Sequence, residues 1–190
     1  MTPEMTFEEA RPLIKNGDAI NIYRPNGWGI KNALYAVIDF FSGSPIYHVA
    51  VALWMTTPNG TRRLMCVEAN LLGGKRIVPL SIYWRRRMEV MPWPATYDFS
   101  RMEESLVARV ATQPYGLFNF ITIGVREFFG IKKPAKSISQ GQVCSELVSN
   151  AWIEGGFPFN DTVVSPGKLK GEMIRLGVSP SIVIIPPKTT

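Results

Sequence analysis

The stretch that decides the fold is Ser139-Gln-Gly-Gln-Val-Cys-Ser-Glu-Leu-Val-Ser-Asn-Ala-Trp152, a polar loop that leads directly into an amphipathic helix. Residues at the i, i+3, i+4 and i+7 spacing share one face of a helix. Here that stripe consists of Cys144, Leu147, Val148 and Ala151. The helix is expected to end at Gly155-Gly156, and the thiol stands in its first turn, at the head of the face that must be buried.

A cysteine in this position suits covalent catalysis. Unpaired backbone N–H groups and the positive end of the helix dipole favour a thiolate in the first turn of a helix. A nucleophilic thiol also needs a base, and the sequence holds one histidine, His48, within a predicted strand. The simpler alternative is a small buried thiol in a core helix, because free cysteine is among the most buried residue types.

Length and composition indicate a globular protein. A chain of 190 residues with 46% hydrophobic and 19% charged residues fits one domain over 1–190, although two lobes around a cleft would also fit. The longest apolar runs, at 33–41 and 117–125, fall short of the roughly 20 residues that span a bilayer, so no transmembrane helix is expected. The acidic N-terminus lacks the pattern of a signal peptide, which favours a cytoplasmic protein.

Charge and cysteine content limit the kinds of partner and cofactor that the chain is expected to bind. The net charge of +6 favours an anionic partner, such as a membrane surface, a cell-wall polymer or nucleic acid. Nucleic acid is the least favoured, since no known binding motif accompanies the basic residues. Two cysteines do not make a disulfide framework, and with a single histidine they supply no metal-ligand spacing, so neither a metal nor another cofactor is expected.

The rest of the chain alternates between strands and short helices. Strands are predicted at 18–23, 46–54, 62–70, 76–80, 88–93 and 181–185, and helices or helical turns at 6–17, 29–41, 81–87, 100–112, 117–129 and 166–177. Ser100 is the expected N-cap of one helix, with Glu103 at its N3 position, and Ser165 is the N-cap of another. The cluster Trp84-Arg-Arg-Arg87 indicates either a polyanion-binding site or a solvated rim.

The register of one hairpin can be derived from its turn. A three-residue loop, Pro58-Asn-Gly60, pairs Thr57 with Thr61, which places His48 opposite Asn70 and diagonal to Glu68. A two-residue Asn-Gly turn would put Glu68 on the other face of the sheet. The three-residue loop is favoured because Pro58 cannot donate a hydrogen bond to the ladder.

With this register the histidine face of the hairpin consists mostly of small residues, and a helix can approach such a surface closely. It comprises His48, Ala50, Ala52, Cys66, Glu68 and Asn70. We expect the cysteine helix to lie on this face and to bring thiol, imidazole and carboxylate together. Either Glu68 or Asn70 could orient the imidazole, and the carboxylate is preferred because it stabilises an imidazolium more strongly. The alternative for Glu68 is a solvent-facing strand residue.

Several short motifs follow one another along the chain. They are Tyr47-His-Val-Ala-Val-Ala-Leu53, Val67-Glu-Ala69, Pro114-Tyr-Gly116, Val143-Cys-Ser-Glu-Leu-Val148 and Ser165-Pro-Gly-Lys-Leu169. This series resembles the circularly permuted papain-like hydrolases of the NlpC type, especially their YiiX-like branch, with the lecithin:retinol acyltransferase group more distant. The resemblance runs from Asp18 to Leu169, and its most specific part is Cys-Ser-Glu-Leu-Val.

The resemblance implies roles for three residues. In that family the histidine, the acid and the cysteine follow in this order along the chain, which makes Cys144 the nucleophile, His48 the base and Glu68 the orienting residue. It also implies an α+β fold in which an antiparallel sheet packs against the helix that carries the cysteine. The chain departs from the family in lacking an obvious export signal and in insertions at 84–97 and 118–136.

The sequence therefore predicts a thiol hydrolase that cleaves an amide or ester bond, either in a cell-wall peptide or in an N-acyl lipid. The backbone N–H of Cys144 is the first expected donor to the carbonyl oxygen, and Tyr47, Gln142 and Tyr115 are candidates for further oxyanion or substrate contacts. The alternative is a catalytically silent binding module for an anionic membrane surface or polymer.

Overall fold

The computed structural model describes residues 1–24, 44–70, 74–112, 144–160, 162–163 and 165–187. The fold belongs to the α+β class, as predicted, and is built on a seven-stranded sheet in the order β1-β7-β6-β2-β3-β4-β5. Neighbouring strands are antiparallel except for the parallel pair β1 and β7. In chain order the elements are β1 (Glu4–Met5), α1 (Phe7–Ala10), η1 (Arg11–Leu13), β2 (Ala19–Tyr23), β3 (Ile46–Thr56), β4 (Arg62–Asn70), β5 (Gly74–Pro79), η2 (Leu80–Tyr83), β6 (Met88–Met91), α3 (Phe99–Thr112), α5 (Cys144–Glu154), α6 (Pro166–Arg175) and β7 (Ile182–Ile184), where η marks a 3-10 helix.

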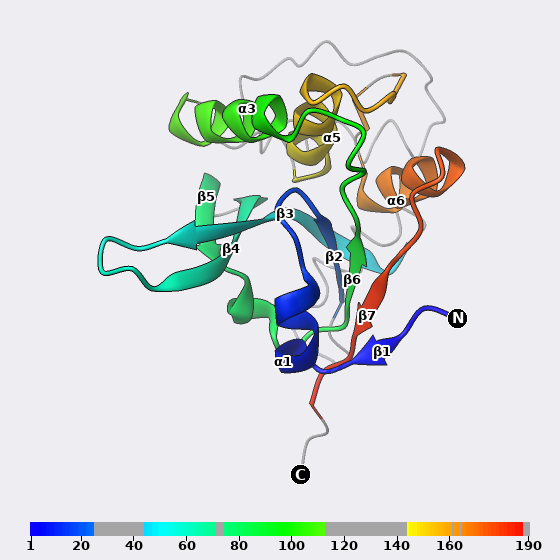
Figure 1. Cartoon of the computed structure of the whole chain (residues 1–190). Helices are drawn as coiled ribbons and strands as arrows, with labels where there is room; N and C mark the ends of the chain where they lie inside the picture. The colour runs from blue at the N-terminus through cyan, green and yellow to red at the C-terminus, as the bar shows by residue number, and fades with distance from the viewer. Residues whose placement is uncertain (25–43, 71–73, 113–143, 161, 164, 188–190) are drawn as a thin grey trace.

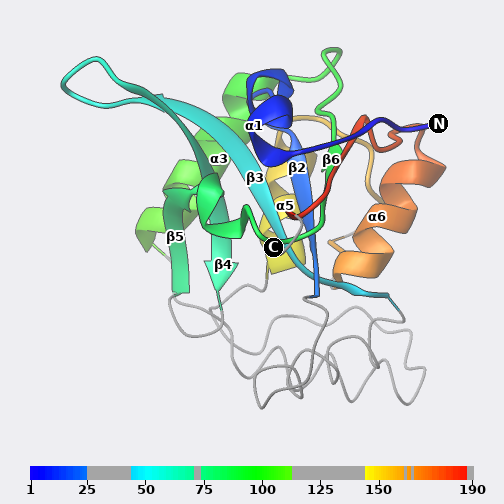
Figure 2. The ribbon, with the colours of Figure 1, turned by 90° about the horizontal axis from the view of Figure 1, so that it is seen from below.

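The sheet is covered on both faces, so it separates two hydrophobic cores (Figures 1 and 2). Helices α3, α5 and α6 pack on the first face, where Met102, Leu147 and Leu169 are fully buried. Helix α1, the segment that follows it and η2 pack on the second face through residues such as Phe7 and Leu80. The strands therefore bury both of their faces, which explains why β2 and the centre of β3 do not alternate between buried and exposed residues.

The predicted register of the β3–β4 hairpin is confirmed. The N–H of Thr57 donates to the carbonyl of Thr61 at 2.9 Å, and Gly60 has the positive φ of +79° that the turn requires. The ladder then pairs residues from Thr56 with Arg62 to Val51 with Val67. Beyond Val51 and Val67 the two strands no longer pair with each other, although both continue toward the end of the sheet that carries His48. The predicted pairing of His48 with Asn70 was therefore wrong, because the strands part before they reach these residues.

The predicted position of the cysteine helix was correct in part. Helix α5 does pack against the sheet, but on the face of Val49, Val51 and Val67 and not on the small-residue face of His48 and Ala50. The valine face offers more apolar area for the helix to bury. The small residues are covered by bulky side chains from the N-terminal segment and η2, namely Phe7, Ile14, Leu80 and Tyr83.

Helix caps follow the sequence in one case and differ in another. The Ser165 side chain accepts a hydrogen bond from the N–H of Lys168 at the start of α6, as predicted. Ser100, by contrast, is not the N-cap of α3, because the helix begins at Phe99 and the Asp98 carboxylate accepts from the N–H of Arg101 at 3.1 Å. An aspartate immediately before the apolar run thus takes the role expected of the serine.

An aromatic cluster closes the core beneath α5. The fully buried Trp152 meets Trp93 and Phe157 edge to face, at centroid distances of 5.0 and 4.8 Å. Gly155 lies where the chain leaves α5, and a Cβ atom there would come within 2.6 Å of Trp93 and 2.9 Å of the Asp98 carbonyl oxygen. Close packing therefore requires glycine at this position.

The predicted helices at 29–41 and 117–129 lie outside the described residues. Among the helices that the structure does describe, none has both the length and the apolar character needed to cross a membrane.

Candidate active site

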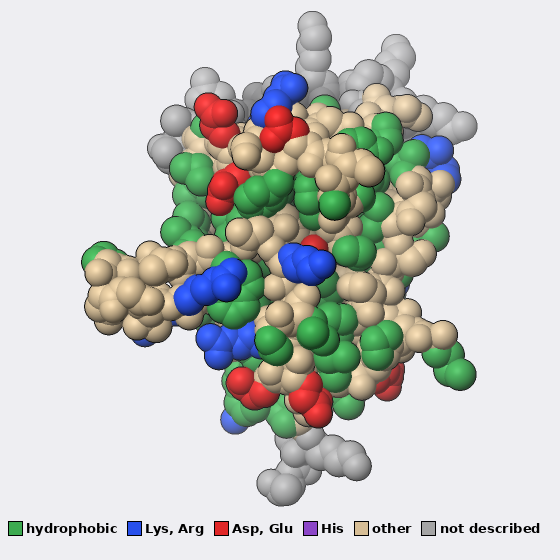
Figure 3. Space-filling model, in the orientation of Figure 1, with side chains coloured by type: hydrophobic (Ala, Val, Ile, Leu, Met, Phe, Trp, Pro, Cys, Tyr) green, Lys and Arg blue, Asp and Glu red, His purple; other side chains and the backbone are tan. Residues whose placement is uncertain are grey.

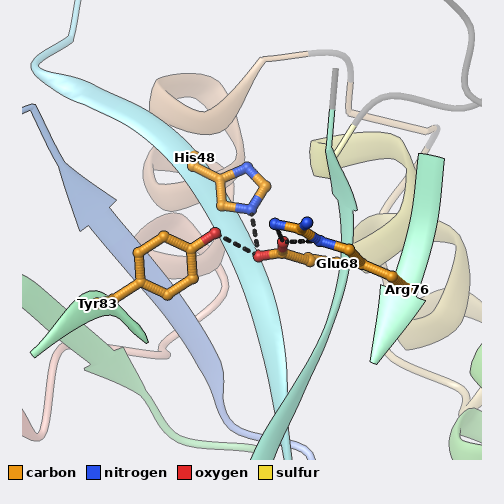
Figure 4. Close-up of polar contacts among 4 residues, drawn as sticks. All are labelled: His48, Glu68, Arg76 and Tyr83. Atoms are coloured by element: carbon orange, nitrogen blue, oxygen red, sulfur yellow. Dashed lines mark hydrogen bonds and ion pairs between the residues drawn. The ribbon is translucent and has the colours of Figure 1, made fainter. Parts of the chain in front are cut away.

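The site lies between β3 and β4, at the end of the sheet where these strands diverge (Figure 4). His48 comes from β3 and Glu68 from β4, and the imidazole Nε2 lies 2.9 Å from the carboxylate Oε2. Both side chains are buried, with relative exposures of 6% and 0%. Of the two candidate orienting residues, Glu68 is thus the one that is hydrogen-bonded to Nε2, and this bond leaves Nδ1 of the ring for another partner.

The Cys144 side chain is that other neighbour of the imidazole. Burial by itself would lower the pKa of His48, but the negative charge of the Cys144 thiolate, a hydrogen bond to it and the Glu68 carboxylate raise that pKa above its ordinary value of 6.5. The charged imidazolium is therefore favoured beside Cys144 and Glu68. This is the arrangement that a cysteine nucleophile with a histidine base requires.

The thiol and the imidazole meet although α5 and the His48 side chain belong to opposite faces of the sheet. Cys144 is the first residue of α5, so its thiol stands at the end of the helix and not over the middle of the sheet. The β3–β4 ladder stops at Val51 and Val67, and Figure 4 shows the imidazole and the Glu68 carboxylate in the space between the diverging strands. The gap in the sheet is what allows the contact.

Two further side chains, Arg76 and Tyr83, hold the carboxylate of Glu68. Arg76 lies directly across from Glu68 on β5, and its Nε and Nη2 atoms are 2.8 and 2.7 Å from Oε1. The Tyr83 hydroxyl, from η2, donates to Oε2 at 2.5 Å. Glu68 thus accepts from three side chains, and both of its oxygens are engaged (Figure 4).

These contacts keep Glu68 ionised. Burial would raise the pKa of its carboxyl group, but the hydrogen bonds and charges of His48, Tyr83 and Arg76 outweigh burial and lower the pKa from 4.5 to about 2. Burial and the adjacent carboxylate raise the pKa of Tyr83, so its hydroxyl is protonated at neutral pH and can donate to Glu68. The carboxylate can therefore orient the imidazole and stabilise its charge.

Sequence reasoning missed both Arg76 and Tyr83. The register of the β4–β5 hairpin pairs Glu68 with Arg76, so an argument like that used for the first hairpin could have found the arginine. No pattern pointed to Tyr83, because it reaches Glu68 from a 3-10 turn packed on the second face of the sheet.

The three candidates for oxyanion or substrate contacts were Tyr47, Gln142 and Tyr115. The Tyr47 ring stacks beside the imidazole of His48 with a centroid distance of 6.0 Å, and its role as an oxyanion donor stays a prediction. Gln142 and Tyr115 lie outside the described residues.

The second cysteine, Cys66, is fully buried in the second core. Burial, followed by the charge of Glu68, raises the pKa of its thiol. A neutral thiol of this kind is a core residue.

Within the described part of the chain, no group of three or more histidine, cysteine, aspartate and glutamate side chains has an arrangement that would hold a metal ion. A comparison of the chain with models of known protein families found no match, and a comparison with curated proteins found none either.

Proposed function

We propose that this protein is a cysteine hydrolase in which Cys144 is the nucleophile, His48 the general acid and base, and Glu68 the residue that orients His48. The observation that carries the proposal is the position of His48, which has the Cys144 thiol on one side and a fully buried, triply hydrogen-bonded carboxylate on the other. A structural core histidine has no need of a thiolate and a carboxylate together.

The reaction begins when the Cys144 thiolate attacks the carbonyl carbon of an amide or ester. Negative charge develops on the carbonyl oxygen, and the N–H of Cys144 is the expected donor to it, since a first-turn N–H has no partner within its own helix. The His48 imidazolium gives its Nδ1 proton to the leaving amine or alcohol, and a thioester of Cys144 remains.

The second half of the reaction uses the same groups. His48, now neutral, takes a proton from water through Nδ1 while the water oxygen attacks the thioester carbonyl. The carbon–sulfur bond breaks, the acid product leaves, and the thiolate and imidazolium are restored. Glu68 holds the ring through Nε2 during both steps, so that Nδ1 stays directed at the reacting atoms.

The proposal includes a permuted papain-like fold of the NlpC type and, as substrates, amide bonds of cell-wall peptides or of N-acyl lipids. The order of histidine, acid and cysteine along the chain supports this, as does the mostly antiparallel sheet beside the cysteine helix. The test of the proposed fold is an experimental structure that includes residues 25–43 and 113–143.

The test of the catalytic pair is the rate of Cys144 alkylation by iodoacetamide as a function of pH. We expect a Cys66→Ser protein to react at pH values well below the ordinary thiol pKa of about 8.5, and a His48→Ala variant of it to lose this reactivity. Turnover of murein peptides and N-acyl lipids then distinguishes the substrates, with Cys144→Ala as the inactive control. An ordinary thiol titration that His48→Ala leaves unchanged would contradict the proposal.

A further inference from the structure

The β3–β4 hairpin extends beyond the sheet as a two-stranded arm (Figure 1). The last residue of β3 that pairs with β2 is Val51, and the pairing of β4 with β5 begins at Met65. Residues 54–64 therefore pair with each other but with no third strand among those that the structure describes. A two-stranded ribbon of this kind is marginally stable alone and needs other contacts at its base.

The base of the arm is anchored by Trp54. Its indole Nε1 donates to the carbonyl of Ile14 at 2.8 Å, and its backbone N–H donates to the Asn16 side chain at 2.6 Å. The guanidinium groups of Arg62 and Arg11 lie against the indole ring, 4.8 and 5.6 Å from its centroid. These contacts hold two arginines in place at the surface.

Exposed apolar side chains lie on the arm and on the turns beside its base. Of the seven large hydrophobic residues that are exposed in the described part of the chain, four lie here: Leu13, Met55, Ile82 and Trp84. Leu13 belongs to η1 and Ile82 to η2, beside Ile14 and Tyr83 of the second core, and Trp84 follows η2. Met55 belongs to the arm, on the strand face opposite to Trp54. Figure 3 shows hydrophobic and basic side chains next to one another at the base of the arm.

The charged groups at this surface are mainly basic. The arginines are Arg11, Arg62, Arg63, Arg85 and Arg86. Within the described residues none of these five forms an ion pair with a carboxylate, whereas Arg87 is paired with Glu4. Helix α1, on the same side of the sheet, carries the exposed acids Glu8 and Glu9, and Glu9 is engaged in the capping box with Thr6. We call the five arginines and the four apolar residues the arginine face.

We propose that this protein docks on an anionic phospholipid surface through the arginine face. Arginines beside exposed tryptophan and aliphatic side chains suit the interface of a bilayer, where the charges meet lipid phosphates and the apolar groups enter the acyl boundary. Nucleic acid is less favoured because guanidinium groups already lie against the rings of Trp54 and Trp84, and a stacking base would have to compete with them.

The arm end of the docking surface is distant from the candidate active site, whereas Ile82 and Trp84 flank Tyr83, which is hydrogen-bonded to Glu68. His48 and Met55 are separated by seven residues of one strand, which corresponds to about 23 Å at roughly 3.3 Å per residue. The inference does not rest on the proposed hydrolase activity, and it would hold for a protein without catalysis.

The test is cosedimentation with vesicles of phosphatidylcholine alone and of phosphatidylcholine mixed with phosphatidylglycerol. We expect binding to the mixed vesicles only, and binding that weakens as salt is added. The variants Arg62→Gln/Arg63→Gln and Arg85→Gln/Arg86→Gln should each weaken binding about thirtyfold, at about fivefold for each charge near the surface. The variant Met55→Ser/Trp84→Ser should weaken binding at high salt as well, because its effect is not electrostatic.

The matched control is Arg101→Gln/Arg175→Gln, which removes two exposed charges from α3 and α6 on the other face of the sheet. This variant should keep at least a third of the binding. An equal loss of vesicle binding in the control would mean that only the net charge matters, and it would contradict docking through the arginine face. The proposal of an anionic lipid partner would be contradicted if the protein binds no vesicles, or if it binds equally with and without phosphatidylglycerol. Tight binding of duplex DNA with no binding of vesicles would contradict it as well.

Discussion

Tyr83→Phe tests whether Glu68 is held as an ionised carboxylate. The change removes one hydroxyl and keeps the ring, which is buried and packs 5.9 Å from the imidazole of His48. What is lost is a 2.5 Å hydrogen bond to a charged acceptor that has no access to water. Glu68 Oε2 still accepts from His48, so the substitution leaves no buried oxygen without a donor.

The expected loss in free energy of unfolding follows from this geometry. A hydrogen bond to a charged group contributes about 1.5 to 3 kcal/mol, and the remaining donor at Oε2 places the loss near the lower half of that range, about 2 kcal/mol. For a protein of this size, that corresponds to a decrease in melting temperature of about 4 to 8 °C.

The loss should depend on pH in a defined direction. The folded-state pKa of Glu68 is lowered from 4.5 to about 2, so the stability contributed by its ionised form is complete above 4.5 and is lost as the pH falls toward 2. Tyr83→Phe raises that folded-state pKa. The difference in free energy of unfolding between wild type and variant should therefore be full at neutral pH and smaller at about pH 3, below the ordinary glutamate pKa.

Urea denaturation at both pH values measures this difference. Tyr97→Phe is the matched control, because the Tyr97 ring packs against Trp93 and Phe157 on the other face of the sheet, and no hydrogen bond of its hydroxyl is recorded among the described residues. We expect the control to change stability by less than about 0.5 kcal/mol. An equal loss in the two variants, or a Tyr83→Phe loss that is the same at both pH values, would refute the reasoning.

Three further predictions follow from the site and from the core. Cys144→Ala should abolish turnover while the melting temperature stays within a few degrees of wild type, and unfolding of this variant would instead indicate a core thiol. Glu68→Gln should slow alkylation of Cys144 at neutral pH by about tenfold or more, because the imidazolium loses a charge-assisted hydrogen bond. Gly155→Ala should destabilise the fold by about 1 to 3 kcal/mol, since its Cβ would collide with Trp93. The control is Gly171→Ala in α6, where a Cβ meets open space and should stabilise the fold by about 0.5 to 1 kcal/mol. Urea denaturation measures both changes, and equal effects would contradict the packing argument.

Local patterns were sufficient for most of the elements. Period-2 alternation and turn residues predicted β2, β3 and β4 to within about two residues at each end, the usual uncertainty of an element boundary. The missing N–H donor of Pro58 favoured a three-residue loop and so predicted the hairpin register, and with it the approach of Glu68 to His48. These predictions succeed because backbone geometry and hydrogen bonding act over a few neighbouring residues.

Faces and distant contacts were harder to predict. The small-residue surface of Ala50 and Ala52 was expected to receive the cysteine helix, but both faces of β3 are apolar, and periodicity does not say which element covers which face. The N-cap of α3 was misplaced by two residues for a simpler reason: Asp98 and Ser100 are both good N-cap residues, and only the path of the chain into the helix separates them.

The sequence by itself determined the class of the fold, the strand that carries His48, the helix headed by Cys144 and the register that brings Glu68 near the imidazole, because each depends on short-range geometry and residue type. Only the tertiary structure decided that α5 lies on the valine face, that β3 and β4 part at Val51 and Val67, and that Tyr83 closes on the carboxylate. These depend on how side chains from distant segments fill one volume at the density of a protein interior, and no local pattern encodes that packing.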